Sequence, residues 1–246
     1  MDSIQPIIGV FICPFIATVL CVYPAKFLAH SLDLVDHPTS AKHKSHTKPT
    51  PYGGALAIIL GISVSIFFLT PEIIKILDQI TNNNATWIKN LKWIVSEFQA
   101  KHITVSPFLF CSLLIVVIGL IDDWRGLSPF VRLIFQIMIT LLLVVSEPSF
   151  SLRIFETSNF NIFATVLWIV ILTNAFNFLD NMDGLSAGLG AISTIFTGYF
   201  ALLIGDFSMA FLSFTIFGSL CGFLIFNLPP ASIFMGDAGS LGLGFA

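Results

Sequence analysis

The sequence predicts an all-α, polytopic membrane protein, and three observations predict it. Of its 246 residues, 56% are hydrophobic and 10% are charged, and the mean hydropathy is +0.93. Soluble domains carry about 25% charged residues. The apolar residues form runs close to the roughly 20 residues that a spanning helix needs, and polar clusters separate these runs. We therefore expect one integral-membrane domain over residues 1–246, with about seven or eight transmembrane helices.

The apolar runs define the expected helices in chain order. They cover residues 7–29, 53–70, 106–121, 129–146, 161–179, 185–204 and 207–226. The third run is short for a span, so its helix is expected to begin earlier, near Ile103. An eighth apolar segment opens at Gly239 and is too short to cross the bilayer. Residues 71–105 are expected to form a surface loop with an interfacial helix, because Trp87 and Trp93 favour that depth.

Composition also excludes several classes of function. The net charge is −3 and no long basic stretch occurs, so no nucleic-acid partner is expected. The four cysteines lie in apolar runs, without the spacing of a disulfide framework or a zinc site. Two glycine pairs, Gly184 with Gly188 and Gly218 with Gly222, have the small-residue spacing that allows helices to pack closely.

Four polar clusters stand between the apolar runs, and two expected spans separate each cluster from the next. The clusters are residues 36–54, Asp122-Asp123, 174–184 and 227–237. A chain that crosses the bilayer twice returns to the side that it left, so all four clusters are expected at one face. Lys and Arg divide almost evenly between the two sides, so the positive-inside rule does not orient the chain.

The adjacent pair Asp122-Asp123 follows an expected helix directly. Two neighbouring acids repel one another, and acids at the carboxyl end of a helix oppose its dipole. Acidic side chains near membrane depth are costly and are candidates for function. The alternative is a solvated turn, which Gly126 and Pro129 would support.

Polar residues recur at three-residue intervals in the third cluster. Asn174, Asn177 and Asp180 would share one helix face, with Asp183 just beyond. Such a row could bind a ligand that offers donors and acceptors, and the alternative is an amphipathic helix end at the interface. In the fourth cluster Pro229-Pro230 stops the preceding helix, and Asp237 either binds a ligand or forms the N-cap of a new helix.

The first cluster is basic, with three Lys and three His between Asp36 and Lys48. It suits an anionic phosphate, or it is an ordinary basic membrane-flanking loop. Together the four clusters bring carboxylates, amides and cations to one face. Hard oxygen ligands select Mg²⁺ or Mn²⁺, which typically bridge one or two carboxylates and substrate phosphates. The predicted chemistry is phosphate handling at a membrane surface.

These residues resemble the polyprenyl-phosphate N-acetylhexosamine-1-phosphate transferases, which include phospho-MurNAc-pentapeptide translocase and the GlcNAc-1-phosphate transferases of O-antigen and teichoic acid synthesis. The matching motifs, in order, are SHTKPTPYGG (45–54), GLIDD (119–123), GLSP (126–129), Arg132, Gln136, NAFNxxDxxDGL (174–185) and FMGDAGS (234–240). The resemblance covers almost the whole chain. It implies an all-α fold of about ten or eleven helices, and hence a chain that is incomplete at its carboxyl terminus.

The resemblance implies a reaction and its partners. A UDP-N-acetylhexosamine would give its sugar-1-phosphate to undecaprenyl phosphate and release UMP, the first membrane step of cell-envelope polysaccharide synthesis. Nucleotide sugars are cytosolic, so the resemblance implies a bacterial inner-membrane protein with its site in the cytosol and its amino terminus outside. Family members often dimerise, which leaves a homodimer open. Two alternatives remain, an inactive truncated scaffold and a secondary transporter with ion-carrying acids.

The resemblance also assigns residue roles. Asp122, Asp123 and Asp237 are expected to be catalytic and to hold Mg²⁺, or Mn²⁺, against the diphosphate. The predicted substrate-binding residues are His46, Lys48, Arg132, Asn174, Asn177, Asp180, Asp183, Asn227 and Phe234. Among these, Phe234 would stack on uracil, and Lys48 and Arg132 would neutralise phosphate. An apolar groove beside the site would take the isoprenoid chain.

Overall fold

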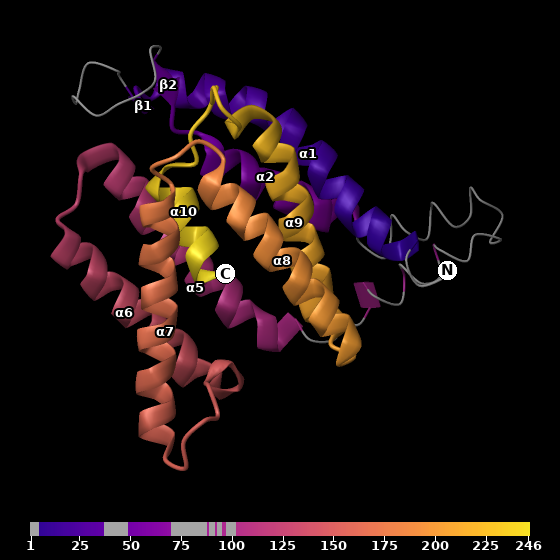
Figure 1. Ribbon diagram of the computed structural model, residues 1–246, viewed down its shortest axis with the longest axis vertical. Helices are drawn as coiled ribbons and strands as arrows, with labels where there is room; N and C mark the ends of the chain where they lie inside the picture. Colours follow the sequence, from indigo (N-terminus) through magenta and orange to yellow (C-terminus); the bar gives the residue numbers. More distant parts are fainter. Residues whose placement is uncertain (1–4, 37–48, 70–87, 89–91, 93–94, 97–101) are drawn as a thin grey trace.

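The computed structural model describes residues 5–36, 49–69, 88, 92, 95–96 and 102–246 (Figure 1). These residues form a bundle of helices with one short strand pair. The elements are α1 (Gln5–Ser31), β1 (Val35–Asp36), β2 (Thr50–Pro51), α2 (Gly54–Phe68), α5 (His102–Arg125), α6 (Pro129–Ser146), the 3₁₀ helix η2 (Pro148–Phe150), α7 (Ser158–Leu179), α8 (Leu185–Leu203), α9 (Phe207–Asn227) and α10 (Gly236–Phe245).

The predicted all-α membrane architecture is confirmed. Within the described residues, six helices, namely α1 and α5 to α9 in part or whole, are long and apolar enough to cross a bilayer, and α2 is a shorter apolar helix. Large apolar side chains such as Phe27, Phe130 and Phe178 are exposed on the outside of the bundle, as expected for helices that face lipid. The expected interfacial loop falls mostly on residues outside the described part of the chain.

The expected helix boundaries hold except at one position that matters for the site. Helix α5 begins at His102, which confirms the early start expected near Ile103. It does not end at residue 121, because it continues through Asp122 and Asp123 to Arg125. The two acids therefore lie in the last turn of a helix, and the tight turn follows them at Gly126, whose φ is +67°.

Small residues decide how closely the helices approach. Gly218 and Gly222 on α9 lie against the carbonyl oxygens of Phe11 and Phe15 on α1, so a Cβ has no room there and the predicted close packing is confirmed for this pair. At Gly188 no helix uses the room that the spacing allows, because among the described residues no atom of another helix lies within 4 Å of a Cβ built there. A glycine spacing alone therefore does not identify a packing surface.

The described polar clusters gather at one end of the bundle (Figure 1). The ends of α5, α7 and α9, the start of α10 and the β1–β2 pair all lie at the upper end of that view. Strand pairing sets Val35 opposite Pro51. The backbone of Gly54 then donates a 2.9 Å hydrogen bond to the carbonyl of Phe234, which ties the start of α2 to the loop before α10. The three clusters that the structure describes in full, and the described ends of the first cluster, therefore lie at one end of the bundle (Figure 1).

Candidate functional site

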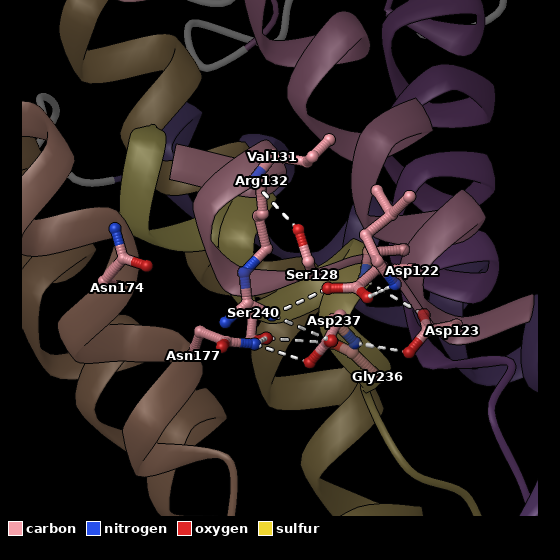
Figure 2. A network of polar contacts seen from close by, with 12 residues as sticks. Asp122, Asp123, Ser128, Val131, Arg132, Asn174, Asn177, Gly236, Asp237 and Ser240 are labelled. Carbon is pink, nitrogen blue, oxygen red and sulfur yellow. Dashed lines mark hydrogen bonds and ion pairs between the residues drawn. The ribbon is translucent and has the colours of Figure 1, made fainter. Parts of the chain in front are cut away.

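The centre of the site is a charge network around Arg132 (Figure 2). Ser128 caps the amino end of α6 and places Arg132 one turn into that helix. Its Nη1 donates to Asp122 Oδ2 at 2.7 Å and to Asp237 Oδ2 at 3.2 Å. One nitrogen therefore joins carboxylates from α5 and α10.

The two bridged carboxylates differ in their access to solvent. The Asp122 side chain is 6% exposed, and its Oδ1 also accepts from the backbone N–H of Leu127 at 2.6 Å. The Asp237 side chain is 36% exposed. Asp237 is thus the carboxylate of this pair that an incoming ligand can reach with least rearrangement.

Helix α7 supplies the other contact to Asp237. Asn177 Nδ2 donates to Asp237 Oδ1 at 2.6 Å and to Ser240 Oγ at 3.0 Å. Burial raises the pKa of Asp237 above its ordinary value, and the nearby Asp122 adds to this, while the Asn177 hydrogen bond and the Arg132 charge oppose it. The Asn177 hydrogen bond and the Arg132 charge thus offset part of the cost of burying this carboxylate.

Asp123 points away from Arg132 and toward the first turn of α10 (Figure 2). Its Oδ1 accepts from the backbone N–H of Asp237 at 2.8 Å, and its Oδ2 accepts from that of Ala238 at 3.1 Å. The alternative that Asp237 is an N-cap is wrong, because Asp237 lies inside the first turn and Met235 occupies the cap position without a side-chain cap.

Asp180 lies at the carboxyl end of α7 and contacts the same turn. Its carboxylate accepts a hydrogen bond from the backbone of Gly236. Burial raises the pKa of Asp180 to about 8, and the negative charges of Asp237 and Asp123 add to this. Asp180 therefore belongs to the same cluster of acids as Asp123 and Asp237.

Three of the predicted substrate-binding residues make structural contacts. Asn174 donates to Gln136 Oε1 at 2.6 Å, so it joins α7 to α6 and lies apart from the carboxylates (Figure 2). Asp183 accepts from the backbone of Ala231 at 2.9 Å. Asn227 is 3% exposed, and its amide group accepts from Gly184 and donates to the carbonyl of Ile233. The last two residues hold the loop over residues 228–235.

Phe234 sits on that loop beside Tyr52, with ring centroids 6.0 Å apart. The loop has one further support that sequence reasoning missed. Lys26 of α1 donates to Ser232 Oγ at 2.8 Å, and its ammonium lies 5.2 Å from the ring centre of Phe226. The signal was available, since Lys26 is a charged residue inside a predicted span. The predicted substrate-binding residues His46 and Lys48 lie outside the described residues.

The site contains hard oxygen donors suited to a divalent cation. Among the described residues, no group of three or more His, Cys, Asp or Glu side chains is arranged as a ready-made metal site. Magnesium, however, is usually held by one or two carboxylates together with substrate phosphates. The partly exposed Asp237 beside Asp122 would supply carboxylate ligands of this kind.

Among the described residues, acids, amides and the Arg132 guanidinium thus meet at the ends of helices in a membrane-type bundle. The chain belongs to glycosyl transferase family 4, whose family model matches residues 105–246.

Three relatives show which kinds of transferase this chain is similar to. The chain is 33% identical over 237 residues to the probable undecaprenyl-phosphate N-acetylglucosaminyl 1-phosphate transferase of Bacillus subtilis, covering 93% of this chain and 58% of the relative. It is 29% identical over 224 residues to the phospho-N-acetylmuramoyl-pentapeptide-transferase of Streptococcus thermophilus, covering 85% and 59%. It is 30% identical over 247 residues to the decaprenyl-phosphate N-acetylglucosaminephosphotransferase of Mycobacterium tuberculosis, covering 93% and 55%. The chain thus spans little more than half the length of these relatives.

Proposed function

We propose that this protein transfers an N-acetylhexosamine-1-phosphate from a UDP-sugar to undecaprenyl phosphate and releases UMP. The observation that carries the proposal is the Arg132 bridge between Asp122 and Asp237, at the membrane-face end of spanning helices in a family 4 chain. GlcNAc or a closely related sugar is the proposed donor group. The relatives' names support the reaction class, since each names a polyprenyl-phosphate or a phospho-sugar transferase.

The proposed reaction is one displacement at phosphorus. An oxygen of the lipid phosphate bonds to the phosphorus that carries the sugar, and the bond from that phosphorus to the bridging oxygen breaks. The bridging oxygen leaves with UMP, and the sugar diphosphate remains on the lipid. Such a transfer depends mainly on alignment of the reacting groups and on neutralisation of their charge.

The described side chains suit these two tasks. Arg132 is 20% exposed and can turn part of its guanidinium from the carboxylates toward a phosphate. Asp237, held by Asn177, is the proposed main ligand of Mg²⁺, or Mn²⁺, with Asp122 next to it. A bound metal would neutralise the diphosphate and polarise its oxygens. Phe234 is proposed to stack on the uracil ring, beside the loop that Asn227 and Asp183 hold.

We place the site in the cytosol, where nucleotide sugars are found, and so the amino terminus outside, in a bacterial inner membrane. A secondary transporter would instead need acids near the middle of its spans. Asp122 and Asp123 lie in the last turn of α5, and Asp237 lies in the first turn of α10.

Release of UMP from UDP-GlcNAc by the purified membrane protein tests the proposal. It should require both Mg²⁺ and undecaprenyl phosphate, and a panel of UDP-HexNAc donors identifies the sugar. Asp237→Asn should abolish release while the protein stays folded. Asp206→Asn is the matched control, because Asp206 caps the other end of α9 and Asn caps a helix about equally well. No release with any UDP-HexNAc, or normal release by Asp237→Asn, contradicts the proposal.

A further inference from the structure

The two adjacent aspartates of α5 contact different partners. Asp122 faces Arg132, with one oxygen on the guanidinium and the other on the Leu127 amide. Asp123 makes neither contact, because consecutive residues on a helix point in different directions. Both of its oxygens accept backbone N–H groups of α10, at 2.8 and 3.1 Å.

Helix α10 needs such a partner. The first four N–H groups of any helix lack partners within the helix, and the residue at the cap position here is Met235, whose side chain makes no capping hydrogen bond. The N–H of Gly236 is bound by Asp180, and those of Asp237 and Ala238 are bound by Asp123. The carboxylates of Asp180 and Asp123 thus accept the hydrogen bonds that a capping side chain of α10 would otherwise accept.

The backbone on both sides is shaped for this contact. Gly236 has a φ of +76°, and a Cβ there would lie 2.7 Å from Asp123 Oδ2. One turn before Asp123, Gly119 lies against the backbone of Asp237 and Ala238, where a Cβ would come within 2.6 Å of the Asp237 carbonyl oxygen. The last turn of α5 therefore packs directly against the first turn of α10.

The geometry points to a division of roles within the pair. Asp123 is a positioning residue that caps α10 and thereby orients Asp237. It is neither a metal ligand nor a proton acceptor. This inference rests on the proposed function for its kinetic test. Asp122 and Asp237 then remain the carboxylates that face the reacting groups, with Arg132 between them.

Neutral substitutions distinguish a cap from a reacting carboxylate. Asn keeps one acceptor oxygen for one of the two amides that Asp123 binds, and Ala keeps none. Asp123→Asn should keep kcat within about tenfold of wild type and leave the half-saturating Mg²⁺ concentration unchanged. Asp123→Ala should lose about 100-fold, because a displacement of about 1 Å at a catalytic group costs that much. Asp122→Asn removes the same charge one residue away and should lose more activity than Asp123→Asn.

A second readout does not depend on activity. Hydrogen–deuterium exchange of the segment 234–245, in detergent without metal or substrate, reports the amides of Asp237 and Ala238. Exchange should be fastest in Asp123→Ala, intermediate in Asp123→Asn, which keeps one acceptor oxygen, and close to wild type in Asp122→Asn.

The inference is overturned if Asp123→Asn is as inactive as Asp123→Ala, if Asp123→Ala is as active as wild type, or if Asp123→Ala exchanges like wild type. If the Ala variant does not fold, the comparison of Asp123→Asn with Asp122→Asn decides. Absence of transfer by the wild-type protein would reject the proposed function alone, and the exchange measurement would then decide whether Asp123 caps α10.

Discussion

Gly119 offers a sharp test of how the site is built. Gly119→Ala adds one methyl group on the face of α5 that touches α10. An ideal Cβ there would lie 2.6 Å from both the Asp237 carbonyl oxygen and the Ala238 nitrogen, which are backbone atoms. Nonbonded carbon contacts are normally about 3.5–4.0 Å. The two helices must therefore separate by roughly 1 Å.

The expected cost follows from that displacement. Forcing a methyl group into a packed contact costs about 1–3 kcal/mol, and Ala gains about 1 kcal/mol over Gly within a helix. The free energy of unfolding should thus fall by no more than about 2 kcal/mol. Activity should fall much further, by about 100-fold, because Asp237 moves by about 1 Å.

The chain contains a matched control for this substitution. Gly188 lies in helix α8, and among the described residues a Cβ there would have no atom within 4 Å apart from the nearby backbone of α8 itself. Gly188→Ala should raise the free energy of unfolding by about 1 kcal/mol, since only helix propensity changes. The assay is transfer of radiolabelled sugar phosphate from UDP-GlcNAc to undecaprenyl phosphate, with thermal unfolding measured on the same preparations. Wild-type turnover by Gly119→Ala, or an equal loss in Gly188→Ala, would refute the reasoning.

Three further predictions follow from the same site. Arg132→Ala should reduce kcat about 100-fold, because it leaves Asp122 and Asp237 unbridged. Arg132→Lys should keep kcat within about tenfold of wild type, because both bridges come from one nitrogen that an ammonium can replace. Equal losses in the two variants would contradict this. Phe234→Ala should raise KM for the UDP-sugar about tenfold, since stacking on a base contributes about 1–3 kcal/mol, and an unchanged KM would remove Phe234 from the nucleotide site. The pKa of Asp180 is raised to about 8, so the folded state favours its protonated form; that contribution is complete below about pH 4 and is lost as the pH rises toward 8. The melting temperature of metal-free protein should therefore fall relative to that of Asp180→Asn between pH 5 and 8, and parallel curves would contradict this.

The fold was largely predictable because hydrophobic run length determines where a membrane chain can span. The seven expected spans correspond to α1, α2 and α5 to α9, and counting crossings placed the described clusters at one end. Packing was less predictable. Two glycine pairs have the same spacing, yet Gly218 packs against α1 while a Cβ at Gly188 would contact no other helix among the described residues. The spacing shows that close approach is allowed, and only the tertiary arrangement shows where a partner lies.

The membership of the site was easier to predict than the contacts within it. The motifs indicated Asp122, Arg132, Asn177 and Asp237, and the structure joins all four in one network. The motifs did not separate side chains that face this network from those that hold its backbone. Asn227 illustrates this, because its amide oxygen accepts from the backbone N–H of Gly184 and its amide nitrogen donates to the carbonyl of Ile233.

The end of α5 explains why the two adjacent acids could not be told apart from the sequence. A helix that ended at residue 121 would leave Asp122 and Asp123 in a turn, where both could turn toward one ligand. Because α5 continues to Arg125, the pair is held on a helix, and neighbours on a helix face different directions. One carboxylate then reaches Arg132 while the other reaches the amides of α10. Four more helical residues thus give two adjacent acids different partners, a guanidinium for Asp122 and two backbone amides for Asp123.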